Sequence, residues 1–217
     1  MHDDLIIQRP NATAAQDVDL LLLFHGVGSG AEDLRPLGEA LAARRPSAWV
    51  VSVRSSQRSD FGTGWQWFSV QGVTEANRPG RVAAAMLAFI EKVSVWQRQT
   101  GVAAARTTLI GFSQGAIMAL ESTQQAQPQI ARRVIAIAGR FAQPPRMAPA
   151  GTVVNLMHGE QDRVMPVGLA VEAEAQLRTL GARSTLERFA GLGHGIDGRV
   201  VNAIVQRLGE AQAESGR

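Results

Sequence analysis

The sequence predicts an α/β fold in which a mostly parallel sheet is flanked by helices. Short apolar runs alternate along the chain with longer amphipathic stretches, a pattern typical of strand–helix repeats. Several runs are almost continuously apolar, as expected for strands that helices cover on both faces. The length of 217 residues suits one domain with a sizeable core. Residues 1–217 are therefore predicted to form a single domain.

The same patterns predict seven strands and five helices. In the second helix, Val82, Met86, Phe89 and Val93 recur at helical spacing, which indicates a core-facing stripe and not a cofactor site. The strands are predicted at Leu5–Gln8, Asp19–Phe24, Trp49–Val53, Thr107–Ile110, Arg133–Ile137, Val153–Met157 and Thr185–Phe189. The helices are predicted at Asp33–Arg44, Arg81–Gln99, Gln114–Gln124, Val167–Leu180 and Gly198–Leu208.

Two stretches have no clear hydrophobic period. Residues 54–80 are largely polar but contain several aromatic side chains, and residues 139–151 contain three prolines, Pro144, Pro145 and Pro149. Long irregular segments in a compact domain are often functional, so both are candidates for loops beside a site. The polar tail, residues 209–217, is expected to be frayed.

Composition excludes several classes of protein. The chain has no cysteine, which rules out disulfides, zinc–thiolate sites, iron–sulfur clusters and a cysteine nucleophile. The formal net charge is only +3 although the sequence pI is about 10.8, because nearly all basic residues are arginines and tyrosine is absent. The arginines are scattered among acidic residues, which does not favour a nucleic-acid or anionic-membrane partner.

The apolar runs are too short for membrane insertion. The longest, from about Leu20 to Phe24, is far below the ~20 residues that a membrane-spanning helix needs. The first residues are acidic and do not resemble a secretory signal. A cytoplasmic location is therefore expected.

A candidate nucleophile lies in the segment Gly111-Phe112-Ser113-Gln114-Gly115, which fits the pattern G-x-S-x-G. The pattern is short, but a predicted strand precedes it and a predicted helix follows it. A sharp strand–turn–helix with glycines two positions before and two positions after the serine is what a nucleophile elbow requires. The alternative is an ordinary strand-to-helix turn with two structural glycines. The context favours Ser113 as a nucleophile.

A serine hydroxyl needs a base, and that base needs an acceptor that orients it. Asp162 follows the strand ending at Met157, and Glu160 is a rival carboxylate in the same loop. His194 lies between two glycines on the loop before the last helix and has no obvious structural task. The alternatives are a turn or capping role for Asp162 and a surface position for His194.

The remaining histidines do not indicate a metal site. His2 is near the terminus, whereas His25 and His158 each follow a strand and precede a glycine, which favours hydrogen bonding within turns. No H-x-x-x-H spacing is present. Neither a metal nor a cofactor is predicted.

A glycine-rich loop, His25-Gly26-Val27-Gly28-Ser29-Gly30, directly follows the second predicted strand. Attack on a carbonyl places negative charge on its oxygen, which preorganised backbone N–H groups stabilise. The amide of Val27 in this loop and the amide of Gln114, after the serine, are the candidate oxyanion donors. The glycine spacing does not fit the dinucleotide pattern G-x-G-x-x-G, so nucleotide binding is disfavoured.

With these motifs in order, the chain resembles the phospholipase/carboxylesterase family of bacterial α/β-hydrolases, whose relatives include acyl-protein thioesterases. The resemblance runs from about Leu20 to Leu208 and rests on the segments LLLFHGVG, WFSVQG, LIGFSQGAIMAL, HGEQDRVMP and GLGHGID. It implies an α/β-hydrolase fold with Ser113 as nucleophile, Asp162 in preference to Glu160 as acid, and His194 as base. It also implies that Val27 and Gln114 supply the oxyanion amides. Many relatives have W-F-D where this chain has Trp67-Phe68-Ser69.

The resemblance implies a serine hydrolase that cleaves small-molecule carboxylic esters of small to medium acyl chains. The side chains expected to line an apolar acyl site are Trp65, Trp67, Phe68, Val164 and Met165; the alternative for each is a local hydrophobic cluster. Thioester cleavage, perhydrolysis, and a binding module without turnover are alternatives on the same fold. A homodimer is compatible with the sequence.

Overall fold

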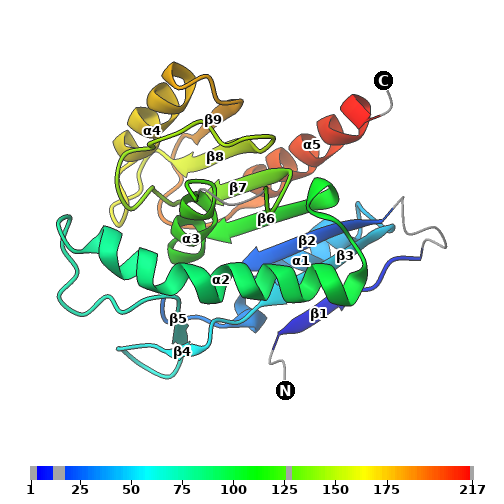
Figure 1. The fold of residues 1–217 in the computed structure, drawn as a ribbon, viewed down its shortest axis with the longest axis horizontal. Coiled ribbons are helices and arrows are strands. Elements are labelled where there is room, and N and C mark those ends of the chain that lie inside the picture. The colour runs from blue at the N-terminus through cyan, green and yellow to red at the C-terminus, as the bar shows by residue number, and fades with distance from the viewer. Residues whose placement is uncertain (1–3, 12–17, 126–128, 216–217) are drawn as a thin grey trace.

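The computed structural model describes residues 4–11, 18–125 and 129–215. A seven-stranded sheet crosses the molecule in the order β1-β3-β2-β6-β7-β8-β9 (Figure 1). Only β1 is antiparallel, where it pairs with β3, and the other neighbours are parallel. The strands are β1 (Leu5–Gln8), β2 (Asp19–Phe24), β3 (Ala48–Val53), β6 (Thr107–Phe112), β7 (Arg133–Ile137), β8 (Val153–Gly159) and β9 (Ser184–Phe189). The predicted α/β-hydrolase fold with a mostly parallel sheet is confirmed.

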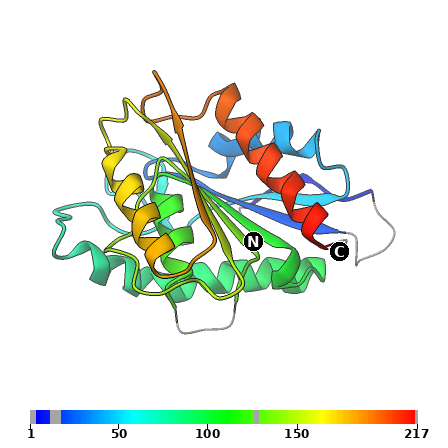
Figure 2. The same cartoon turned by 90° about the horizontal axis from the view of Figure 1, so that it is seen from above.

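Helices cover both faces of this sheet (Figure 2). One face carries α2 (Arg78–Thr100), α3 (Gln114–Ser122) and α4 (Gly168–Thr179), and the other carries α1 (Arg35–Ala42) and α5 (Gly198–Ser215). The central strand β2 explains why two cores form. Its residues Leu20, Leu22 and Phe24 pack with the first group of helices, whereas Leu21 and Leu23 pack with the second.

Each helix differs from its prediction at one end or both. The 3₁₀ turn η2 (Ala31–Leu34) occupies the predicted start of the first helix, and α1 begins only at Arg35, where Pro36 takes an early position that helices tolerate. The second helix begins before the predicted Arg81, again with a proline in its first turn. The last helix does not end at Leu208. Residues 209–215, expected to form a frayed tail, continue it, and residues 216–217 lie outside the described residues.

The segment 54–80 contains a small hairpin that the sequence did not predict. Its strands β4 (Gln57–Arg58) and β5 (Trp65–Gln66) pair antiparallel and are too short to show a hydrophobic period. The short turn η3 (Ala104–Arg106) precedes β6.

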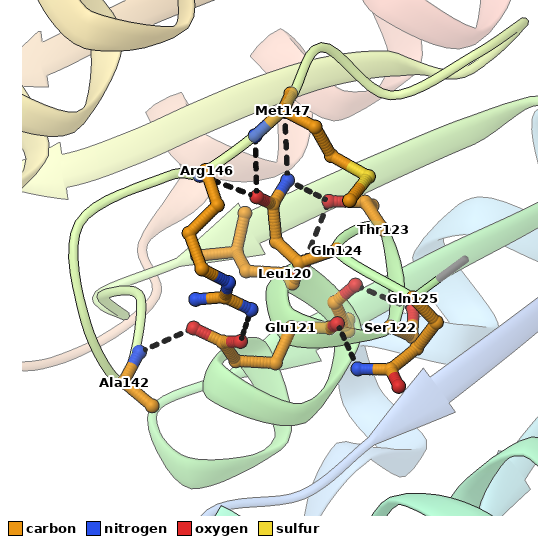
Figure 3. Close-up of polar contacts among 10 residues, drawn as sticks. Leu120, Glu121, Ser122, Thr123, Gln124, Gln125, Ala142, Arg146 and Met147 are labelled. Carbon is orange, nitrogen blue, oxygen red and sulfur yellow. Dashed lines mark hydrogen bonds and ion pairs between the residues drawn. The ribbon is translucent and has the colours of Figure 1, made fainter. Parts of the chain in front are cut away.

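The second irregular segment, 139–151, is fastened to the end of α3 (Figure 3). The buried carboxylate of Glu121 accepts the backbone N–H of Ala142 at 2.8 Å and forms an ion pair with Arg146 at 2.8 Å. The Gln124 side-chain oxygen accepts the N–H groups of Arg146 at 2.7 Å and Met147 at 3.2 Å. Because these contacts satisfy backbone groups that have no strand or helix partner, the loop has a defined position.

Within the described residues, no helix combines the length and apolar character needed to cross a membrane.

Candidate active site

Ser113 lies at the turn between β6 and α3. Its backbone has φ 53° and ψ −115°, a conformation that non-glycine residues rarely adopt. The turn is held because the Ser113 N–H donates to the carbonyl of Ile137 at 2.9 Å, and its carbonyl accepts the N–H of Ile117. Position 115 must be glycine, since a Cβ there would collide with the backbone carbonyls of Phe24 and His25. The sequence therefore produces a strained turn that presents the serine at the carboxyl edge of the sheet.

The structure brings the three predicted polar residues into one hydrogen-bonded chain. The Nε2 atom of His194 lies 2.9 Å from the Ser113 Oγ, and its Nδ1 atom lies 2.8 Å from Oδ2 of Asp162. The ring of Phe112 packs against the imidazole, with 5.1 Å between the ring centroids. An imidazole held between a hydroxyl and a carboxylate can take a proton from the serine and be stabilised as it becomes charged.

Asp162 is held in place by more than the histidine. Its Oδ1 accepts the backbone N–H groups of Val164 and Met165 at 2.8 and 2.9 Å, and His158 Nε2 lies 3.3 Å from Oδ2. Burial alone would raise the pKa of this carboxyl, but the hydrogen bonds from His194 and the two amides outweigh burial and lower the pKa. The carboxylate is therefore ionised where it faces the imidazole.

The loop bearing His194 lies directly against the loop bearing Asp162. The backbone N–H of Gln161 donates to the carbonyl of Leu192 at 2.9 Å. A Cβ at position 159 would meet the carbonyls of Leu192 and Gly193, so glycine at 159 permits this close approach. Glu160, the rival carboxylate, pairs with Arg188 at 3.7 Å and takes no part in the chain of hydrogen bonds.

The glycine-rich loop after β2 is fixed by His25. Because His25 Nε2 accepts the backbone N–H of Ser55 at 3.1 Å, the ring proton is on Nδ1, which donates to the Gly26 carbonyl at 2.7 Å. Burial lowers the pKa of His25, which keeps the ring neutral in this role. The Trp67 indole N–H donates to the His25 carbonyl at 2.9 Å. Both peptide oxygens before Val27 are thus held.

Two residues that lie with Ser113 in the wall of one cavity have backbone amides without a partner among the residues that the structure describes. Gln114 is the first residue of α3, where a helix leaves its N–H without an internal partner. Val27 lies in the loop just described. Within the described part of the chain, neither amide donates a hydrogen bond. An available N–H from each loop is what the predicted oxyanion assignment requires.

A cavity of about 600 Å³ opens beside Ser113. Its apolar lining includes Phe68, Val164 and Met165, three of the side chains predicted for the acyl site, together with Ile117 and Leu169. Its charged lining was not predicted and consists of Glu75, Arg78, Arg140 and Glu172. Glu75 and Arg78 are three residues apart, but Arg140 and Glu172 come from two other segments, so no local motif marks the set.

The two tryptophans predicted for the acyl site lie elsewhere. Trp67 is buried against Phe24 and Phe89, with ring centroids 5.6 and 5.3 Å away. Trp65 is covered by the guanidinium groups of Arg54 and Arg58, 3.6 and 4.0 Å from its ring centroid. Neither lines the cavity beside Ser113.

The segment 65–67 supports the glycine-rich loop instead. The Trp65 backbone exchanges hydrogen bonds with this loop, accepting from Gly28 and donating to Ser29, each at 2.8 Å. Trp67 donates from its indole as described above. Trp65 is in extended backbone, so its N–H and carbonyl pair with the glycine-rich loop as neighbouring strands pair in a sheet.

Gln114 joins the elbow to the loop that carries Phe68. Its buried side-chain amide accepts the N–H of Trp67 and donates to the carbonyl of Phe68, both at 2.7 Å. The position of Phe68 in the cavity is thus tied to the residue that follows Ser113.

The Ser69 side chain is bound by a carboxylate from another part of the same segment, that of Asp60. The Oδ2 atom of Asp60 accepts hydrogen bonds from the Ser69 hydroxyl at 2.8 Å and from the amides of Val70 and Gln71 at 2.8 and 3.1 Å. Its Oδ1 accepts from Gln66 at 2.9 Å. These hydrogen bonds lower the pKa of Asp60 to about 2. The bond from Gln66 has the largest effect, and the bond from Ser69 is next.

The sheet order, the strained elbow and the Ser–His–Asp arrangement together define a serine hydrolase of the α/β-hydrolase class. Comparison with known proteins identifies the family. A phospholipase/carboxylesterase family model matches residues 3–210, so the chain belongs to that family, and it is a serine hydrolase of the esterase class. The resemblance inferred from the sequence is confirmed.

Individual relatives agree with this family. The chain is 46% identical over 207 residues to the esterase YpfH of Escherichia coli strain K12. The aligned region covers 95% of this chain and 88% of the relative. The crystal structure of esterase PE8 has a TM-score of 0.81 at 27% identity and covers 97% of this chain and 98% of its own. The carboxylesterase of Bacillus cereus, at 20% identity, shares the fold with a TM-score of 0.79 over 97% of this chain and 95% of its own.

Proposed function

We propose that this chain hydrolyses carboxylic esters of small to medium acyl chains through an acyl-enzyme on Ser113. The observation that carries the proposal is the unbroken hydrogen-bond chain from the Ser113 hydroxyl through His194 to Asp162. In the first half-reaction, His194 takes the serine proton as Oγ attacks the acyl carbon. The imidazolium then gives this proton to the departing alcohol oxygen, so the ester C–O bond breaks and a seryl ester remains.

Water completes the cycle by the same geometry. His194 takes a proton from a water molecule, whose oxygen attacks the seryl ester. The proton then returns to Ser113 Oγ as the carboxylic acid leaves. Asp162 remains ionised throughout and stabilises the charged imidazole, which its lowered pKa supports.

The amides of Val27 and Gln114 are proposed to hold the carbonyl oxygen as it becomes negative. Two features support this role: both N–H groups are available beside the serine, and His25 and Trp67 hold the peptide groups that precede Val27. Because these donors are fixed before the reaction, they need no reorganisation when charge develops.

The acyl chain is proposed to lie along Phe68, Val164 and Met165. A cavity of about 600 Å³ with this apolar wall is within the range of sites for small molecules. Val164 is largely exposed, which places it at the mouth of the cavity.

A labelling experiment tests the hydrolytic assignment. The folded protein is treated with a fluorophosphonate, which reacts with activated serines, and the modified residue is located by mass spectrometry. We expect label on Ser113 in the native protein and none after denaturation or in the H194A variant. An unlabelled Ser113 in folded protein would favour the binding-module alternative. Parallel assays with a matched ester and thioester then determine the preferred leaving group.

A further inference from the structure

Three charged side chains meet at one side of the cavity beside Ser113. Arg140 holds Glu75 through two bonds, Nη1 to Oε1 at 3.0 Å and Nη2 to Oε2 at 2.7 Å. Nη1 of Arg78 lies 2.7 Å from the same Oε2 atom. Two guanidinium groups therefore converge on a single carboxylate in the wall of the proposed substrate cavity.

The burial of the three groups is unequal. The side chains of Arg78 and Arg140 are only 14% and 17% exposed, whereas that of Glu75 is 70% exposed. Nη1 of Arg78 is itself buried and, apart from the ion pair, has no hydrogen-bond partner among the described residues. The two arginines are thus part of the cavity wall, whereas the Glu75 carboxylate contacts them from the solvent side.

The two arginines have firm supports. Arg78 is the first residue of α2, and Arg140 lies on the loop that Glu121 and Gln124 fasten to α3 (Figure 3). The Arg140 Nε also donates to the Phe141 carbonyl at 3.1 Å, which orients its guanidinium plane. Glu75 lies on the turn before α2 with its side chain mostly in solvent. Two mostly buried guanidinium groups that converge on one point are suited to bidentate recognition of a carboxylate.

We propose that Arg78 and Arg140 form an anion subsite of the esterase cavity, and that the substrate is an ester bearing a free carboxylate. In this arrangement Glu75 occupies the subsite when the cavity is empty, and the substrate carboxylate replaces it. Glu172, the other acidic residue in the lining, is exposed. This inference rests on the proposed ester hydrolysis at Ser113, and it adds the substrate class.

The test compares substrates that differ only in one terminal group. Methyl hexanoate and monomethyl adipate carry a methyl and a carboxylate at the same acyl position. Butyl butyrate and γ-butyryloxybutyrate make the same comparison on the alcohol side. Hydrolysis is followed by pH-stat with the full-length protein and in the R78Q, R140Q and E75Q variants. R98Q, a change in an exposed arginine on α2 outside the cavity, is the control.

We expect wild type to have a higher kcat/KM for the carboxylate member of one pair, and that pair identifies which half of the ester reaches the arginines. R140Q and R78Q should lower kcat/KM for this substrate about tenfold or more, the effect of losing a charge-assisted hydrogen bond. Hydrolysis of the neutral partner should change less than about threefold. E75Q should raise kcat/KM for the anionic substrate, because it removes the competing carboxylate, and R98Q should change neither.

Two outcomes separate this inference from the proposed function. Hydrolysis of the neutral esters with no preference for a carboxylate in either pair would overturn the anion subsite and leave the esterase assignment standing. Equal losses on neutral and anionic substrates in R140Q, with no gain in E75Q, would show that the three residues only brace the loops. No hydrolysis of any ester by wild type would instead contradict the proposed function.

Discussion

The side-chain oxygen of Gln114 accepts the backbone N–H of Trp67 at 2.7 Å, and this bond ties the nucleophile elbow to the loop that shapes the cavity. The Gln114 nitrogen completes the clamp by donating to the Phe68 carbonyl. The residue whose backbone amide is proposed to hold the oxyanion therefore also positions the cavity wall through its side chain.

Removing this clamp should affect both stability and turnover. Q114A leaves the buried N–H of Trp67 and carbonyl of Phe68 unpaired, so we expect the free energy of unfolding to fall by about 2–4 kcal/mol. We expect kcat to fall about tenfold because Phe68 is no longer held, even though the amide at 114 remains. Urea unfolding and ester hydrolysis measure the two effects. Q71A, a change in an exposed glutamine of the same loop, serves as control and should alter neither quantity.

Loss of the nucleophile should abolish turnover without loss of the fold. S113A removes only the hydroxyl from a turn that is held by backbone hydrogen bonds. We expect kcat for a p-nitrophenyl ester to fall about 10⁴-fold or more, with circular dichroism and the unfolding midpoint nearly unchanged. Activity close to wild type would remove Ser113 from the mechanism.

The elbow should reject any side chain at position 115. In G115A the new methyl group meets the carbonyls of Phe24 and His25, so we expect a loss of about 3 kcal/mol or more in unfolding free energy, together with loss of activity. Gly80 in α2 has open space around its Cβ position and is the matched control. G80A should stabilise the protein by about 0.5–1 kcal/mol. Equal stabilities of the two variants would contradict this account.

Acid stability should depend on Asp60. Its pKa is lowered to about 2, below the value of about 3.9 expected for an unfolded aspartate. The folded state therefore gains stability from this carboxylate above about pH 4, and that stability is lost as the pH falls toward about 2. Urea unfolding between these pH values should show a steeper loss for wild type than for D60N. Parallel pH profiles of the two proteins would show that Asp60 contributes nothing.

The sheet could be predicted from the sequence because its strands have a strong local signal. In β2 every residue after Asp19 is apolar, since both faces are covered, and the other central strands are largely apolar. Helix ends were predicted less well. A proline in the first turn of α1 and of α2 permits starts that hydrophobic spacing alone does not locate.

The arrangement of Ser113, Asp162 and His194 could be inferred because each residue belongs to a short motif after a strand. The charged cluster of Glu75, Arg78 and Arg140 could not. Arg140 is distant in sequence from the other two and meets them only when two irregular loops are placed by tertiary contacts. Trp65 and Trp67 were expected in the acyl site but lie outside the cavity, for a related reason. Aromatic side chains predict a hydrophobic contact but not its partner, and here the partners are two arginines for one ring and the core for the other.

Ser113 directly precedes α3, whereas the Glu121 carboxylate in its last turn and the Gln124 amide just after it fasten residues 139–151 (Figure 3). The two ends of this one short helix therefore carry the reacting serine and the supports of the loop that bears Arg140, a residue of the proposed anion subsite. Exchange of Glu121 or Gln124, neither of which lines the cavity, should redirect which esters are accepted while the reaction itself stays intact. In such a design, new substrate ranges can evolve without any alteration to the reacting groups.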